Sequence, residues 1–150
     1  MIMLTQPIKY NCKRIFLCIL FLLFFSTSFA NWIPIIRHFT PKNYGAGTQN
    51  WDMVEQVNGW MYVANNYGLL ETDGCHWNLY GISNSTAVRA ITTDRDGNIY
   101  VGGTDEFGVF SSNGLGGLTY KPLSVNIPER YRQFGEVWRL QIDDNKLYVQ

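Results

Sequence analysis

The sequence predicts an all-β protein, a β-propeller of which the first two blades and the start of a third are present. Two observations predict it. Short apolar runs alternate with tight-turn residues, and the same order returns after about 40 residues, which is the signature of four-stranded propeller blades. Hydrophobic residues make up 46% of the chain and aromatic residues 15%, whereas only 16% are charged. This composition is typical of a folded chain and not of a disordered one.

The first copy of the repeat runs from Trp51 to Tyr80. It holds four apolar or aromatic runs, at residues 51–54, 60–64, 69–72 and 77–80. Asn-Gly and Asp-Gly pairs between such runs are strong hairpin signals, because Asn, Asp and Gly tolerate the left-handed backbone of these turns. We therefore expect a four-stranded antiparallel meander.

A second copy and part of a third follow. The second has runs at residues 88–92, 99–102, 106–111 and 118–120, and the third has runs at 137–142 and 147–149. Gly59 and Gly97 are 38 residues apart, whereas Gly68 and Gly108 are 40 apart. This difference predicts two extra residues in the middle loop of the second copy.

The second run of each copy is apolar almost throughout, which predicts sheets that are covered on both faces. A propeller needs about four to eight blades to close its ring. We therefore expect the chain to be the N-terminal piece of a longer protein, with the blades over residues 49–150. The alternative is a complete small β domain, which would leave two exposed edges and one uncovered face.

Residues 1–30 have the features of a secretory signal peptide. Lys9, Lys13 and Arg14 precede an apolar run at residues 15–25, and Ser28 and Ala30 supply small residues for cleavage after Ala30. The apolar run is much shorter than the ~20 residues that span a bilayer. We expect an exported, periplasmic protein, and an uncleaved anchor that continues to Ile36 is the alternative.

Charge and cysteine content argue against several classes of site. Without the leader, nine basic and twelve acidic residues remain, so no nucleic-acid surface is expected. Cys75 is the one cysteine outside the leader, which leaves no intramolecular disulfide or cysteine metal site. Residues 94–97 lack the distal glutamate of a calcium loop, so a hairpin turn is expected there. We predict no metal, no cofactor and no catalytic residue.

Residues 31–48 form a lead-in to the first blade. The apolar stretch 33–39 occupies the place that residues 77–80 occupy before the second blade. We therefore expect residues 33–39 to form an outer strand that is donated to the last blade and closes the ring.

Trp51, Arg89 and Trp138 occupy matching positions where the innermost strands begin, at the mouth of the central channel. Aromatic rings beside an arginine suit stacking on sugar rings and bidentate hydrogen bonds to acidic groups. These three residues are therefore candidate ligand contacts, for a carbohydrate-like ligand. The alternative is that the tryptophans pack between blades and the arginine pairs with an acidic neighbour.

The middle loops and the longer loops between blades lie on the same face of the disc. Binding residues are concentrated on longer loops that a rigid scaffold holds. The polar residues of the two middle loops are therefore added to the candidate ligand contacts; they are Asn65, Asn66, Asp105 and Glu106.

Residues 58–74 and 94–102 resemble the two-component regulator propeller repeat, and residues 44–51 look like the lead-in of exported sensors with this repeat. Thr72, where the family often has an aromatic residue, and Asn145, in place of a turn glycine, depart from the pattern. In that family, propellers precede a triple-tyrosine β-sandwich module, one transmembrane helix and a histidine kinase or a LuxR-type DNA-binding tail.

The resemblance implies a non-enzymatic, ligand-binding sensor region of a transmembrane regulator. Its partners would be the downstream blades and signalling domains, and the signal would pass through a change in the propellers or in a homodimer. Two alternatives stay open. One is an exported propeller enzyme, such as a lyase, with its catalytic residues outside this stretch, and the other is a non-functional truncated product.

Overall fold

The computed structural model describes residues 13, 16–17, 19–21, 34–144 and 146–150. The chain divides into two compact units, Met1–Arg37 and His38–Gln150. In the first unit, residues 13, 16–17 and 19–21 are helical and exposed, and the rest of the predicted leader with its cleavage site lies outside the described residues. No helix among the described residues is long and apolar enough to cross a membrane.

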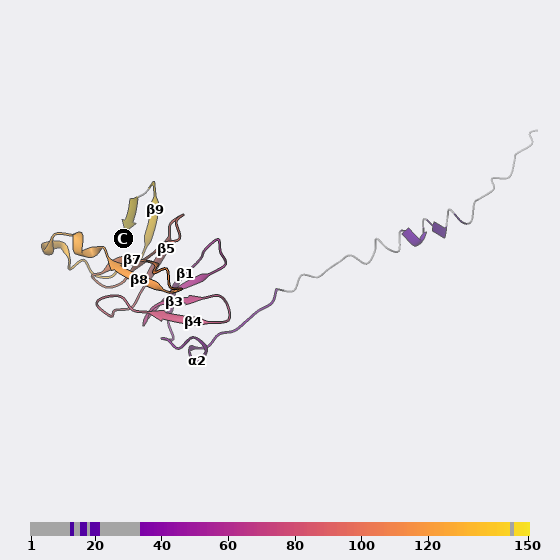
Figure 1. The fold of residues 1–150 in the computed structure, drawn as a ribbon, viewed down its shortest axis with the longest axis horizontal. Helices are drawn as coiled ribbons and strands as arrows, with labels where there is room; N and C mark the ends of the chain where they lie inside the picture. Colours follow the sequence, from indigo (N-terminus) through magenta and orange to yellow (C-terminus); the bar gives the residue numbers. More distant parts are fainter. Residues whose placement is uncertain (1–12, 14–15, 18, 22–33, 145) are drawn as a thin grey trace, which may run out of the picture. The chain divides into compact units, whose positions relative to one another are not determined.

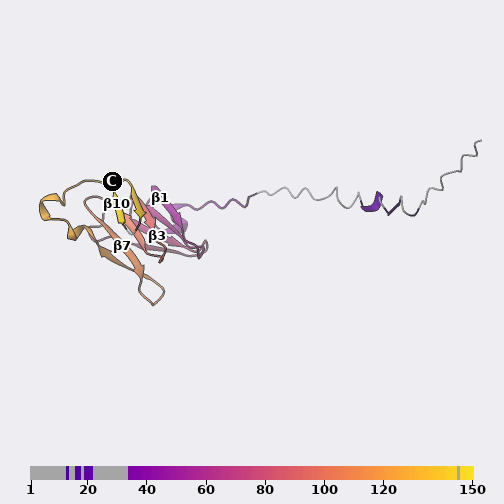
Figure 2. The ribbon, with the colours of Figure 1, turned by 90° about the horizontal axis from the view of Figure 1, so that it is seen from above.

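The second unit is built from antiparallel sheets (Figures 1 and 2). The first sheet has the order β1-β2-β3-β4, the second β5-β6-β7-β8, and the third pairs β9 with β10. The strands are β1 (Asn50–Glu55), β2 (Met61–Asn65), β3 (Gly68–Thr72), β4 (Trp77–Tyr80), β5 (Ala90–Thr93), β6 (Ile99–Gly102), β7 (Phe107–Ser112), β8 (Leu118–Pro122), β9 (Leu140–Asp143) and β10 (Lys146–Val149). The predicted fold class, two four-stranded blades and the start of a third, is confirmed.

The innermost strands of successive blades lie side by side. β5 contacts β1 on one side and β9 on the other. The Asp52 carboxylate on β1 accepts a hydrogen bond from the Ile91 backbone N–H on β5, at 3.2 Å. On the face of the tight turns, the Gln56 side-chain amide donates to the Gly97 carbonyl oxygen at 2.9 Å. The first two blades are therefore joined by polar contacts at their inner strands and at one set of turns.

Hydrophobic side chains fill the two spaces between the blades. The first core lies between the first and second blades and includes Leu69, Ile99 and Phe110. The second lies between the second and third blades and includes Val137, with Tyr100 packed against it. Strand β6 contributes to both cores, Ile99 to the first and its neighbour Tyr100 to the second. This two-sided burial explains why β6 is apolar almost throughout.

The lead-in covers the face of the first blade that is turned away from the second. Tyr44, at the end of the short helix α2 (Pro41–Tyr44), packs with Ala46 against Val63 and Leu70. Trp77 on β4 joins this cluster, with its ring centroid 5.5 Å from that of Tyr44.

The ring-closing strand was predicted over residues 33–39. Residue 33 lies outside the described residues, and residues 34–40 form no strand in the described part of the chain. Ile35 and Ile36 are exposed, and the Phe39 ring packs edge-on against Trp77. None of the ten described strands pairs with this stretch, and the ring-closing role stays a prediction.

The two hairpins that carry the middle loops have the same register, which corrects the count made from the glycines: Met61 pairs with Thr72 and Ile99 with Phe110, at the same separation in sequence. Asn65 pairs with Gly68 across the first loop, and the Gly103 N–H donates to the Glu106 carbonyl oxygen across the second. Glu106, which follows Gly68 by 38 residues, is therefore its structural counterpart. Gly108, two residues after Glu106, pairs with Val101 on β6. The prediction of two extra residues in this loop is wrong, because the two glycines do not occupy matching positions.

Candidate functional site

The structure brings Trp51, Arg89 and Trp138 together in one cluster, which we call the Trp–Arg stack. The Arg89 guanidinium carbon lies 4.3 Å from the centre of the Trp51 ring and 5.0 Å from that of Trp138. The two indole rings are 6.1 Å apart and nearly perpendicular. A guanidinium within about 6 Å of an indole centre is attracted by the electrons of the ring face. The arginine therefore joins two aromatic rings from different blades.

Backbone pairing explains why these side chains meet. The Arg89 backbone N–H donates to the Gly102 carbonyl oxygen, and the Trp138 backbone N–H donates to the Gln150 carbonyl oxygen. Trp51 lies at an irregularity of the β1–β2 pairing, between Asn50 and Asp52. Each residue thus stands just before or at the start of an inner strand. The predicted common position is borne out by this pairing.

The stack is only partly open to solvent. Trp138 is 58% exposed and Trp51 is 38% exposed. The Trp51 indole N–H donates to the Asn66 side-chain oxygen at 2.7 Å, and the Asn66 amide in turn donates to Gln49 at 3.2 Å. Asn66 is therefore the one middle-loop residue of the predicted set that touches the stack directly.

Arg89 also forms an ion pair that the sequence did not identify. Its Nη2 lies 2.7 Å from Oε1 of Glu136, with the two side chains 17% and 33% exposed. Its Nε is buried and has no hydrogen-bond acceptor among the described residues. Glu136 is fixed by an isolated β-bridge to Thr104. An acidic neighbour of Arg89 was one of the two expectations, and the structure shows that this neighbour and the aromatic stack coexist.

Asn65 has a structural role. It is fully buried, and its side-chain oxygen accepts hydrogen bonds from the N–H groups of Gly47 and Tyr67. Its side-chain nitrogen donates to the Gly47 carbonyl at 2.7 Å and to the Gln49 carbonyl at 3.1 Å. These bonds tie the middle loop of the first blade to the lead-in, so we leave Asn65 out of the candidate site.

Glu106 plays the corresponding part in the second blade. It is buried, and its two carboxylate oxygens accept the backbone N–H groups of Ser83 and Asn84, each at 2.9 Å. Burial, with the nearby negative charge of Glu106, raises the pKa of the Tyr120 hydroxyl well above its usual range. Glu106 thus holds the loop between the first two blades, and it too leaves the candidate site.

Asp105 is exposed and holds the next loop. Its carboxylate accepts the Gly135 N–H at 2.6 Å, and its own N–H donates to the Gly135 carbonyl at 2.7 Å. Its φ of +53° is uncommon for a residue other than glycine. Asp105 therefore fixes the segment that carries Glu136, and within the described part of the chain it forms no hydrogen bond with the three residues of the stack.

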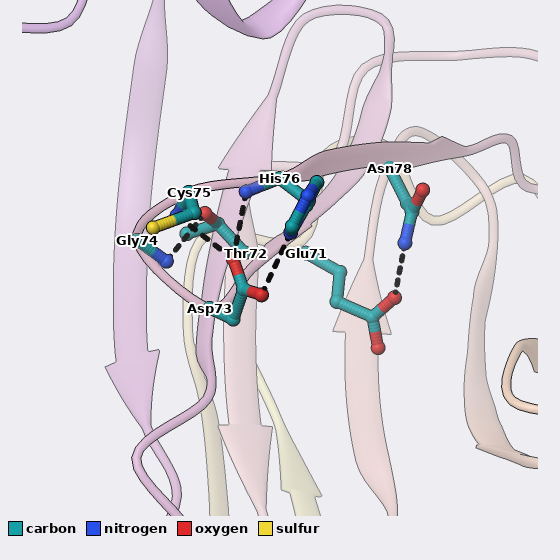
Figure 3. Close-up of polar contacts among 7 residues, drawn as sticks. All are labelled: Glu71, Thr72, Asp73, Gly74, Cys75, His76 and Asn78. Atoms are coloured by element: carbon teal, nitrogen blue, oxygen red, sulfur yellow. Dashed lines mark hydrogen bonds and ion pairs between the residues drawn. The ribbon is translucent and has the colours of Figure 1, made fainter.

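A buried carboxylate lies in the first blade, away from the stack. The Glu71 Oε2 accepts a hydrogen bond from the Asn78 amide at 3.0 Å (Figure 3). It also accepts one from the Tyr80 hydroxyl at 2.9 Å. Burial and the neighbouring Glu71 charge raise the pKa of Tyr62 to about 12. Buried charged groups persist when hydrogen bonds satisfy them, so this cluster stabilises the blade.

The turn between β3 and β4 is closed by Asp73 (Figure 3). Its Oδ1 accepts the backbone N–H groups of Cys75 and His76, and its Oδ2 lies 2.9 Å from His76 Nδ1. Cys75 is an exposed free thiol, and its sulfur points away from the His76 ring. The Asp73–His76 pair therefore stabilises the turn, and its imidazole does not face the Cys75 sulfur.

This pair leads to a pH prediction. The hydrogen bond to Asp73 raises the pKa of His76, and the same bond lowers the pKa of Asp73 well below its usual range. The pair stabilises the turn fully between the ordinary values of 3.8 for Asp and 6.5 for His. This stabilisation is lost as the pH rises through the raised His76 pKa or falls through the lowered Asp73 pKa. In an NMR titration, Asp73→Asn should return His76 toward its ordinary pKa, and an unchanged His76 titration would contradict the pairing.

No group of three or more His, Cys, Asp or Glu side chains that could hold a metal ion lies within the described ranges. Asp94 instead closes its own hairpin turn. Its Oδ1 accepts the N–H groups of Asp96 and Asn98, and its Oδ2 accepts the Asn98 amide and the Tyr100 hydroxyl. Burial acts against ionisation of this carboxyl, but these hydrogen bonds outweigh it and lower its pKa.

Comparison with known proteins supports the repeat. Residues 78–104 match a family model described as a beta-propeller repeat. This stretch runs from the outer strand of the first blade to the middle loop of the second. Searches of curated proteins and of solved structures found no significant match. The chain therefore carries a propeller repeat, in agreement with its sheets.

Proposed function

We propose that this chain forms the first blades of an exported, non-catalytic sensor propeller, which binds a carbohydrate-like ligand at the Trp–Arg stack. The observation that carries the proposal is the meeting of Trp51, Arg89 and Trp138, each from a different blade, around one guanidinium. A ligand at this point would contact three blades at once.

The chemistry of the stack fits such a ligand. Indole rings offer a large flat surface at low cost in conformational entropy, and an arginine offers hydrogen-bond donors in one plane. Sugar rings present both C–H faces and hydroxyl groups. The 58% exposed indole of Trp138 offers the largest accessible aromatic surface of the three side chains.

The ligand proposal predicts the effect of removing one ring. Trp138→Ala in the full-length protein should weaken the binding of oligosaccharides by about tenfold, which corresponds to about 1.4 kcal/mol. Isothermal titration calorimetry against a panel of neutral and acidic oligosaccharides measures the effect. Tyr67→Ala is a matched control, since Tyr67 is an exposed aromatic residue that takes no part in the stack.

Two results would count against this proposal. Equal affinity of the wild-type protein and Trp138→Ala would remove the stack from the binding site. An equal loss in Tyr67→Ala would show a general effect of aromatic removal. Circular dichroism of each variant checks that the blades stay folded.

The sensor part of the proposal is supported by the predicted export signal, the resemblance to regulator propellers and the propeller repeat at residues 78–104. A ligand transmits a signal only if it binds two states of the protein with different affinity. The reading frame that follows the codon for Gln150 tests the context. We expect further blades, one transmembrane helix and a kinase or a DNA-binding tail. A frame that leads to clustered histidines and carboxylates would favour the exported enzyme instead.

A further inference from the structure

The hydrogen bonds of Arg89 are incomplete in a specific way. The Nε and Nη2 atoms form one edge of a guanidinium, and this edge binds a carboxylate side-on through two parallel hydrogen bonds. In this protein Glu136 engages only Nη2, through a single oxygen at 2.7 Å. Nε on the same edge is buried and has no acceptor among the described residues.

This arrangement is costly for the protein alone. A buried donor without an acceptor loses its hydration and gains nothing in return. A carboxylate that bridges both Nε and Nη2 would remove this cost. Nε is buried, and Glu136 holds the neighbouring Nη2, so a carboxylate that is to bridge both atoms has to compete with Glu136 for this edge.

We propose that Glu136 is a specificity-determining residue, which competes with a carboxylate-bearing ligand, such as an acidic sugar, for the Nε–Nη2 edge of Arg89. This inference rests on the proposed function, since it concerns the ligand of the same stack. The guanidinium carbon lies 4.3 and 5.0 Å from the two indole centres, so the rings and Glu136 together hold Arg89 in place. A neutral hydroxyl accepts a weaker hydrogen bond from a guanidinium than a carboxylate does, so we expect a neutral sugar to leave Glu136 in place.

The surroundings of Glu136 allow a change to be transmitted. Its segment is attached to the middle loop of the second blade by the Thr104–Glu136 bridge and by the two bonds between Asp105 and Gly135. Val137, the next residue, is buried in the core between the second and third blades. Release of the Glu136 side chain therefore acts on the segment that connects the two blades.

The test compares Glu136→Gln with the wild type in the full-length protein. The probes are a galacturonic acid trimer and the neutral galactose trimer of the same linkage. Glutamine keeps the size of the side chain but removes the charge that competes for Arg89. We expect the acidic trimer to bind the variant about three- to tenfold more tightly, and the neutral trimer to bind both proteins equally. Glu129→Gln is the matched control, because Glu129 is exposed on the same connecting segment.

The outcomes separate this inference from the proposed function. If the trimers bind but the acidic one binds Glu136→Gln no more tightly than the wild type, the competition is wrong and the stack remains a binding site. If neither trimer binds either protein, nor changes its tryptophan fluorescence, both proposals are overturned. Hydrogen exchange gives a second readout: the acidic trimer, and not the neutral one, should speed exchange at the Gly135 and Val137 amides of the wild type.

Discussion

Replacing Phe110 with alanine should lower the free energy of unfolding by about 3–5 kcal/mol, the range found for large aromatic side chains removed from a core. Phe110 is 1% exposed and belongs to the core between the first two blades. Its ring lies 4.7 Å from Tyr120 and 6.0 Å from Tyr80. The loss should be large because the truncation leaves a cavity that two sheets border. Denaturant unfolding of the full-length protein, followed by tryptophan fluorescence, measures it.

Leu115→Ala is the control for this experiment. Leu115 is 91% exposed in the loop between β7 and β8, so its removal should change the unfolding free energy by less than about 0.5 kcal/mol. An equal effect of the two substitutions would show that the blades do not share the Phe110 core.

The repeat and its strands were predictable because they depend on local signals. Asn58-Gly59 and Asp96-Gly97 mark hairpin turns by their residue types alone, and both turns occur where expected. The apolar run at β6 predicted cover on both faces, and Ile99 and Tyr100 do enter two different cores. Such signals need no knowledge of the distant chain.

Most matching positions across the first two blades were predictable. Tyr62 and Tyr100 lie on the second strands, and Gly59 and Gly97, also 38 residues apart, lie in the turns before those strands. Trp51 on β1 and Arg89 just before β5 mark where the inner strands begin. Gly68 and Gly108 misled the count of loop residues. A glycine is needed where the backbone is left-handed or where a neighbouring atom leaves no room for a Cβ, and such a place need not recur at the same position in each blade.

The partner of Arg89 was harder to predict. Glu136 lies 47 residues away, on a loop with no fixed length between blades. Polar residues in turns are also ambiguous in sequence. Backbone N–H groups of buried loops need acceptors, and Asn65 and Glu106 supply them, whereas the neighbouring Asn66 remains at the surface beside Trp51. The residue type alone does not show whether a polar side chain turns inward to bind loop backbone or stays at the surface.

The lead-in shows the same limit. Tyr44 and Ala46, in and just after α2, cover the apolar face of the first blade formed by Val63 and Leu70, and no local signal in the sequence singled them out. The strand predicted over residues 33–39 concerns a different partner, the last blade of a ring, and stays a prediction. An exposed apolar sheet face promotes association, so this cover protects the first blade.

Gly68→Ala should be among the most damaging single changes, with an expected loss of about 2–6 kcal/mol. Gly68 opens β3 with a φ of +138°, a conformation that costs other residues about 1–3 kcal/mol. A Cβ at this position would also collide with the carbonyl oxygen of Tyr80 on the neighbouring strand β4. Backbone atoms cannot turn away as a flexible side chain can, so overpacking adds about 1–3 kcal/mol.

Gly59→Ala separates the two causes. Gly59 has a φ of +83°, but nothing lies within 4 Å of where its Cβ would be. Gly59→Ala should therefore lower the free energy of unfolding only by the cost of the left-handed backbone, about 1–2 kcal/mol. Thermal and denaturant unfolding of the two variants provides the comparison. A similar loss in both would mean that the close approach of β3 to β4 contributes nothing. A larger loss in Gly68→Ala would show that these strands pack tightly enough to exclude a methyl group.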